Sequence, residues 1–271
     1  MKRLKITSAV LVILYAVLLL LAYGFQERMI FLPDVLPANH IYDFRQPYEE
    51  FFITAEDGAK LSVVFFQQEH AKGAILYFHG NSGNISDLGH VANLIYGKGY
   101  DLFLFDYRTF GKSTGNMSEE ALKGDAQLLY DFALRKYKED NIIIYGRSLG
   151  AGIASGLAAA NHPQKLILES PFYSGVEIGK YRFPFLPVQW LSRYKFPTSE
   201  YVKKINCPIF IFHGTDDSVI PFAQGKRLYE AVPGKNKKIF AIEGGDHKYL
   251  YAFDSFARGI GQVLDQDHVF P

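Results

Sequence analysis

The sequence predicts an α/β fold in which a mostly parallel central sheet is covered by helices on both faces. Short, continuous apolar runs alternate with longer stretches of helical periodicity, which is typical of parallel strands buried on both faces. The chain has 271 residues, a length that suits one undivided domain of this class. The expected strands cover residues 74–78, 102–105, 142–145, 166–168, 209–212 and 239–242.

Composition is that of a globular protein and excludes several functional classes. Hydrophobic residues make up 48% of the chain and charged residues 21%, as in a folded domain. The formal net charge is +1, so no basic field favours a nucleic-acid partner. The single cysteine, Cys207, can form neither an intrachain disulfide nor a Cys-rich zinc site, and its place at the start of an apolar strand favours an inert thiol. The histidines are scattered without ligand spacing, so we expect no metal.

The N-terminus is predicted to be a transmembrane helix. Residues 6–25 carry no charge and are long enough to cross a bilayer as a helix. Three basic residues precede the stretch, namely Lys2, Arg3 and Lys5. Glu27 and Arg28 follow it, and their charges cancel. The positive-inside rule then predicts a single-pass protein whose N-terminus is cytoplasmic and whose remaining chain is extracytoplasmic.

A cleaved signal peptide is the competing interpretation of this N-terminus. Ala22-Tyr23-Gly24 has the small-x-small pattern of a cleavage site, which would give a secreted protein. However, the apolar run is longer than a usual signal core, and residues 29–32 continue it. We therefore favour an uncleaved membrane anchor that consists of residues 1–26.

The rest of the chain divides into a polar linker over residues 27–48 and one domain over residues 49–271. Residues 51–67 alternate around Asp57-Gly58, as in a β-hairpin. Helices are expected over residues 118–137, with Ser118 as N-cap, over 149–161, and over 249–264. In an open α/β sheet the ligand site lies at the carboxyl ends of the strands.

The segment Gly146-Arg147-Ser148-Leu149-Gly150 directly follows an expected strand and opens a helix. This is the context of a nucleophile elbow, a strained turn that holds a serine hydroxyl above the sheet. The glycines are needed because side chains at their positions would collide in the tight reversal. We therefore interpret Ser148 as a nucleophile.

Two further strand ends supply the partners that a serine nucleophile requires. His213-Gly214-Thr215-Asp216-Asp217 follows one strand, and we prefer Asp217 over Asp216 as the carboxylate that orients a histidine. Gly244-Gly245-Asp246-His247 follows the last strand, and its flexible loop lets His247 act as general base. The chain order Ser148, Asp217, His247 matches that of the α/β-hydrolase triad and differs from the orders in chymotrypsin and subtilisin.

The loop His79-Gly80-Asn81 at the end of the 74–78 strand is expected to complete an oxyanion hole. The backbone N–H groups of Asn81 and Leu149 are the candidate donors. We interpret His79 as a structural residue that shapes the loop.

Together these motifs resemble the Bem46-like branch of the α/β-hydrolase superfamily, including members with an N-terminal membrane anchor. The resemblance covers about residues 51–264 and implies the α/β-hydrolase fold, a serine nucleophile and no cofactor. The chain departs from it at Thr109, where members usually have glycine. The motifs are His79-Gly80-Asn81, Phe105-Asp106-Tyr107-Arg108, Gly111-Lys112-Ser113, Gly146-Arg147-Ser148-Leu149-Gly150, His213-Gly214-Thr215-Asp216-Asp217 and Gly245-Asp246-His247.

Residues 171–205 form a proline- and aromatic-rich segment at the place where this fold accepts a small cap insertion. One interpretation is an apolar lid lining an acyl pocket, with Phe172, Tyr173 and Trp190 as candidate substrate contacts. The other is a structural insertion that only packs on the sheet. The leading functional expectation is a membrane-anchored serine hydrolase that cleaves an ester or thioester bond through an acyl-enzyme intermediate. Its expected substrate is a small or acylated molecule, and an anchor beside an apolar lid would favour a lipidic one. A serine peptidase and a non-catalytic, membrane-tethered binding protein are the alternatives.

Overall fold

The computed structural model describes residues 2–265, and its centre is an eight-stranded sheet with the order β10-β9-β8-β7-β4-β6-β3-β2. All neighbours from β10 to β6 are parallel, whereas β3 and β2 are antiparallel to their neighbours. The predicted strands and the hairpin are therefore confirmed. The strands are β2 (Glu49–Thr54), β3 (Lys60–Phe66), β4 (Gly73–Phe78), β6 (Tyr100–Phe105), β7 (Ile142–Arg147), β8 (Lys165–Glu169), β9 (Ile209–Gly214) and β10 (Lys237–Ile242).

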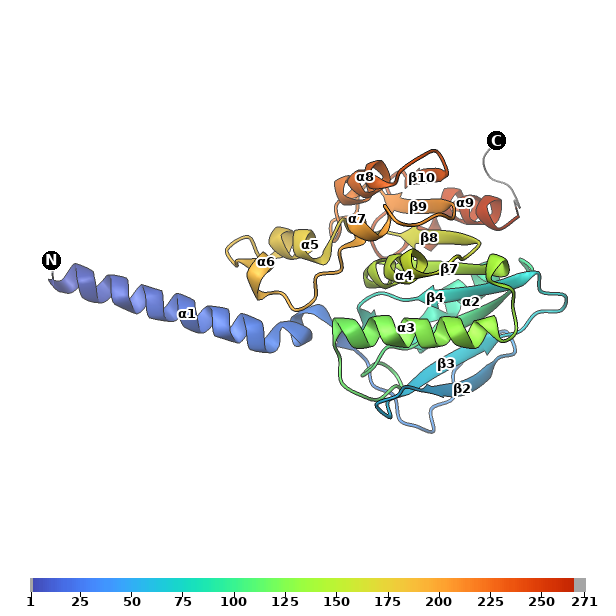
Figure 1. Cartoon of the computed structure of the whole chain (residues 1–271), viewed down its shortest axis with the longest axis horizontal. Coiled ribbons are helices and arrows are strands. Elements are labelled where there is room, and N and C mark those ends of the chain that lie inside the picture. Colours follow the sequence, from blue (N-terminus) through green and yellow to red (C-terminus); the bar gives the residue numbers. More distant parts are fainter. Residues whose placement is uncertain (1, 266–271) are drawn as a thin grey trace.

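Helices cover both faces of the sheet and enclose two separate hydrophobic cores (Figure 1). One core lies under α3 (Glu119–Leu134), α4 (Leu149–Ala160) and α8 (Phe222–Ala231), and the other under α2 (Gly89–Ile95) and α9 (Asp254–Asp265). Successive residues of β4 alternate between the cores, because side chains along a strand point to opposite faces. This explains why the central strands are continuously apolar.

Local capping explains where the predicted helices begin. The Ser118 hydroxyl accepts a hydrogen bond from the N–H of Ala121 at 3.0 Å, and α3 starts at the next residue, Glu119. The last helix begins later than predicted. The Asp246 carboxylate accepts the N–H groups of Lys248 and Tyr249, which forms a turn. A short 3₁₀ helix, η3 (Leu250–Ala252), follows, and α9 starts at Asp254. Two further 3₁₀ helices are η1 (Ile85–Leu88) and η2 (Glu139–Asn141).

The N-terminal helix α1 (Lys2–Ile30) projects from one end of the sheet (Figure 1). It is long and apolar enough to be a candidate membrane span. The helix continues to Ile30, beyond the boundary expected at residue 26. The short strand β1 (Leu32–Pro33) then pairs in parallel with β5 (Ser82–Gly83). The segment expected as a linker is thus helical at its start and tied to the sheet end immediately afterwards.

Between β8 and β9 the chain forms a cap of three short helices, α5 (Gly175–Arg182), α6 (Val188–Leu191) and α7 (Thr198–Tyr201). This cap lies within the segment 171–205. Helix α6 lies beside the C-terminal half of α1 (Figure 1), and the Tyr15 hydroxyl donates to the Phe185 carbonyl at 3.0 Å. Helix α1 and the cap are therefore in direct contact.

Candidate active site

Ser148 occupies the sharp turn between β7 and α4. Its φ is +53°, a left-handed value that non-glycine residues rarely adopt. A Cβ on Gly146 would lie 2.3 Å from the carbonyl oxygen of Gly150, and a Cβ on Gly150 would lie 2.0 Å from that of Phe78. The turn can therefore form only with glycine at both flanking positions.

The structure brings Ser148, His247 and Asp217 together from three different strand ends. His247 Nε2 lies 3.1 Å from Ser148 Oγ, and His247 Nδ1 lies 2.7 Å from Asp217 Oδ2. When Nδ1 carries the proton and donates to the carboxylate, Nε2 is free to accept the serine proton. Asp216 is exposed and lies outside this chain of hydrogen bonds.

The Asp217 carboxylate is buried, and its surroundings keep it ionised. Burial alone would raise the pKa of Asp217, but hydrogen bonding to His213 and His247 holds that pKa below its ordinary value. His213 Nε2 lies 3.4 Å from Asp217 Oδ2, and Asp217 Oδ1 accepts the N–H of Ile220 at 2.7 Å. A fixed negative charge therefore faces the His247 ring.

The loop that carries His247 is held by Arg147, a residue that the sequence analysis did not single out. Arg147 Nη2 donates to the His247 carbonyl at 2.8 Å, and its Nε lies 2.9 Å from Glu169 Oε1. The other Glu169 oxygen accepts the hydroxyl of Tyr145 at 2.7 Å. The available sequence signal was Glu169, a charged residue directly after the apolar run of residues 166–168.

The two candidate oxyanion donors line the same cavity as Ser148. Leu149 is the first residue of α4, so its N–H has no helical carbonyl as partner. Asn81 is fixed by the end of α1 and the residues after it: its side-chain amide donates to the Ile30 carbonyl at 2.6 Å, and its own carbonyl accepts the Leu32 N–H at 2.8 Å.

Two neighbouring residues have structural roles in these loops. His79 is buried, its Nδ1 lies 2.7 Å from the Gly80 carbonyl, and its ring packs 4.3 Å from that of Tyr107. Thr109 has a φ of +69°. Glycine adopts this conformation without strain, which explains its common occurrence at this position in the resembling sequences.

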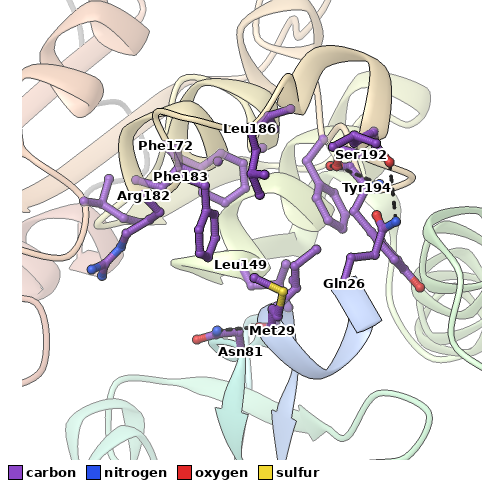
Figure 2. Close-up of a pocket in the computed structure, with 18 of the residues that line it drawn as sticks. Gln26, Met29, Asn81, Leu149, Phe172, Arg182, Phe183, Leu186, Ser192 and Tyr194 are labelled. Carbon is purple, nitrogen blue, oxygen red and sulfur yellow. Dashed lines mark hydrogen bonds between the residues drawn. The ribbon is translucent and has the colours of Figure 1, made fainter. Parts of the chain in front are cut away.

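An apolar cavity of about 440 Å³ opens above Ser148 between α1 and the cap. Figure 2 shows Met29 of α1 facing Phe183 and Leu186 of the cap, with Leu149 and Asn81 nearby. One stripe of α1 contributes to the wall, since positions 22, 26, 29 and 30 recur at helical spacing. The side chains of this stripe are Ala22, Gln26, Met29 and Ile30.

Of the three predicted substrate contacts, the structure brings only Phe172 to the cavity. The Tyr173 ring instead packs under the Arg227 guanidinium, whose Cζ is 4.2 Å from the ring centroid. Trp190 is 77% exposed on the outside of the cap. Neither is among the residues that line the cavity.

The sheet order, the strained serine turn and the strand-end histidine and aspartate define a serine hydrolase of the α/β-hydrolase superfamily. The profile of the family described as serine aminopeptidase, S33, matches residues 69–201 and 197–254. The chain belongs to this family, and the predicted superfamily and fold are confirmed.

Curated relatives and solved structures agree with this assignment. An uncharacterized protein of Mycobacterium tuberculosis is 30% identical over 82% of this chain and 80% of its own. The lysophosphatidylserine lipase ABHD12 of Mus musculus is 29% identical over 89% of this chain and 74% of its own. The Pyrococcus furiosus esterase Pf2001 has a TM-score of 0.71 at 20% identity, covering 87% of this chain and 97% of its own. A soluble variant of Saccharomyces cerevisiae monoglyceride lipase has a TM-score of 0.67 at 17% identity, covering 86% and 100%. These two structures show a shared fold.

Proposed function

We propose that the protein is a membrane-anchored serine hydrolase that cleaves the ester or thioester bond of an acylated, lipidic substrate. The observation that carries this proposal is the chain of hydrogen bonds from Asp217 through His247 to Ser148, whose side chain lines an apolar cavity. Most of the other lining residues are aliphatic or aromatic, which suits an acyl chain.

The geometry supports a two-step acyl transfer. His247 Nε2 takes the Ser148 proton while Oγ attacks the acyl carbonyl, and the imidazolium then gives that proton to the leaving alcohol or thiol. The N–H groups of Asn81 and Leu149 would donate to the oxyanion, at about 3 kcal/mol of transition-state stabilisation each. Water, activated by the same imidazole, releases the acid from the acyl-enzyme.

A lipidic substrate is favoured by the cavity walls and by one relative. The cavity is of the size usual for small-molecule sites, roughly 300–1,000 Å³, and its lining is contributed largely by aliphatic and aromatic side chains of α1 and the cap. The ABHD12 relative is named for action on a lysophospholipid. We extend to this chain only the chemical class, an acyl ester with a long apolar chain.

The family description favours a second candidate, an aminopeptidase. Such an enzyme must bind a substrate ammonium group, and a carboxylate is the usual partner for that cation. The residues that line the described cavity include Arg182 and no aspartate or glutamate. Hydrolysis of aminoacyl p-nitroanilides in preference to acyl esters would support the peptidase instead.

We infer that α1 is retained as a single-pass anchor with a cytoplasmic N-terminus and an extracytoplasmic catalytic domain. The basic residues before the apolar run support this orientation. Cleavage after Gly24 would detach Ala22 and leave an opening in the cavity wall, which disfavours a secreted form. Protease protection of a C-terminal tag in sealed membranes measures the orientation directly.

A fluorophosphonate probe tests the catalytic proposal. It should label the wild-type protein and the Ser155→Ala variant, which removes another buried serine of α4, but not Ser148→Ala. Labelling of Ser148→Ala would refute the assignment of the nucleophile, and an unlabelled wild type would favour the non-catalytic binding protein.

A series of p-nitrophenyl esters tests the substrate class. Rates should rise from acetyl to long acyl chains, because each added methylene gains about 0.8 kcal/mol on burial in the cavity. Activity confined to the shortest esters would refute the lipidic substrate.

A further inference from the structure

We propose that the tip of the cap, residues 183–191, is embedded in the bilayer beside α1, so that the cavity opens within the hydrocarbon and receives its substrate sideways from the leaflet. This deepens the proposed function and rests on it for the nature of the substrate. The partner of the cap tip is the lipid bilayer that surrounds α1.

The cap tip has the composition of a membrane-inserting segment. Its nine residues, Phe-Pro-Phe-Leu-Pro-Val-Gln-Trp-Leu, carry no charge. Phe185 is 86% exposed and Trp190 is 77% exposed, so their hydrocarbon surface is not used inside the protein. Arg182 and Arg193 bracket the segment. Basic side chains at the ends of an apolar insertion can reach the headgroups.

Hydrogen bonds show which residues of α1 lie next to the cap tip. The Phe185 carbonyl accepts the Tyr15 hydroxyl at 3.0 Å, and the Gln26 side-chain oxygen accepts the Arg193 N–H at 2.8 Å. Tyr15 and Gln26 are 11 positions apart, which is about 16 Å at the α-helical rise of ~1.5 Å per residue. The cap tip therefore runs beside the second half of the apolar stretch.

If α1 crosses a bilayer, the cap tip must lie inside that bilayer. If the tip lay in water, residues 15–25 would also lie in water, and only residues 6–14 would remain as uncharged span. Those nine residues extend about 14 Å as a helix, whereas the hydrocarbon core is about 30 Å thick. A spanning α1 thus places Phe185 within the leaflet.

The cavity lies on the side of α1 that faces the cap. Ala22 and Met29 form one wall and Phe183 and Leu186 the other (Figure 2 labels Met29, Phe183 and Leu186). An acyl chain can therefore pass from the leaflet to Ser148 between two apolar surfaces without crossing water. Such a route avoids the cost of exposing the chain to solvent.

Trp190 supplies a direct test, because it is the only tryptophan in the chain. The Ser148→Ala full-length protein is incorporated into phosphatidylcholine vesicles, and Trp190 fluorescence is measured with lipids brominated along the acyl chain and with aqueous iodide. We expect blue-shifted emission, strong quenching by brominated lipid and weak quenching by iodide. Water-like emission that iodide quenches and brominated lipid does not would overturn the proposal, whatever the catalytic activity.

A second test uses Phe185→Glu with Phe52→Glu as matched control, since Phe52 is an exposed aromatic residue on β2, away from α1. Phe185→Glu should lower hydrolysis of a long-chain ester embedded in vesicles at least tenfold and leave hydrolysis of soluble p-nitrophenyl acetate unchanged. The control should change neither rate. An unchanged vesicle rate, or an equal loss on both substrates, would contradict the proposal. A wild type inactive on both esters refutes the proposed function instead, and the depth of Trp190 then decides the insertion alone.

Discussion

Replacement of Arg147 by methionine tests whether the hydrogen bond from Arg147 to the His247 backbone is needed to position His247 for catalysis. The substitution keeps much of the side-chain volume but removes the guanidinium that donates to the His247 carbonyl at 2.8 Å. A hydrogen bond from a charged donor contributes about 1.5–3 kcal/mol. If this free energy is what keeps His247 within reach of Ser148, its loss lowers kcat roughly 10- to 150-fold, at ~1.36 kcal/mol for each factor of ten.

The same substitution leaves Glu169 buried without its cationic partner, at a cost of about 3–5 kcal/mol in folding stability. The double variant Arg147→Met/Glu169→Gln removes that uncompensated charge while an amide oxygen can still accept the Tyr145 hydroxyl. We expect the double variant to recover much of the lost Tm without recovering kcat.

The assay is steady-state hydrolysis of a p-nitrophenyl ester, with Tm measured on the same samples. KM should change little, because Arg147 does not line the cavity. Recovery of wild-type kcat in the double variant would refute the reasoning, since the effect would then come from destabilisation and not from the position of His247.

Three further predictions concern the site and its surroundings. Asp217→Asn should lower kcat by on the order of 10⁴-fold, whereas Asp216→Asn, at an exposed position, should change it less than about twofold; similar losses in both would refute the assignment of the carboxylate. The two histidines described above hold the pKa of Asp217 below its ordinary value despite its burial, so the stability that its ionisation provides is complete above roughly pH 4 and is lost as pH falls further. The Tm of the wild type should therefore fall more steeply between pH 5 and 3 than that of Asp217→Asn, and parallel curves would contradict this. Desolvation of the partly buried Cys207 thiol raises its pKa to about 12, so iodoacetamide at pH 8 should alkylate it slowly in the native protein and rapidly in guanidinium; fast native alkylation would contradict this raised pKa.

The sequence was sufficient for the sheet and for the residues at its strand ends. Each central strand is a continuous apolar run, and that pattern reports burial on both faces without knowledge of any neighbour. Ser148 could be predicted because its two flanking glycines are required by the turn itself, as the close approach of Gly150 to the Phe78 carbonyl demonstrates.

The wall of the cavity could not be predicted in the same way. In a uniformly apolar helix no periodicity marks the stripe that faces a partner. The sequence therefore did not distinguish Ala22 and Met29 from the other apolar residues of the segment. Whether the side chains of Tyr173 and Trp190 point into the cavity or away from it depends on how the three short cap helices pack together. Aromatic content alone does not specify that packing. Glu169 could have suggested an ion pair with Arg147, but the hydrogen bond from Arg147 to the backbone of the distant His247 loop leaves no pattern in the sequence.

The attachment of Asn81 to residues 30 and 32 has a consequence for anyone who would re-engineer this protein. The chain cannot be divided after α1 into a dispensable helix and an independent domain. A truncation starting near residue 25 would lack Ala22 from the wall of the cavity. A chimera with a foreign N-terminal segment should be joined upstream of Tyr15, so that α1 keeps its contacts with both the cap and the loop of Asn81.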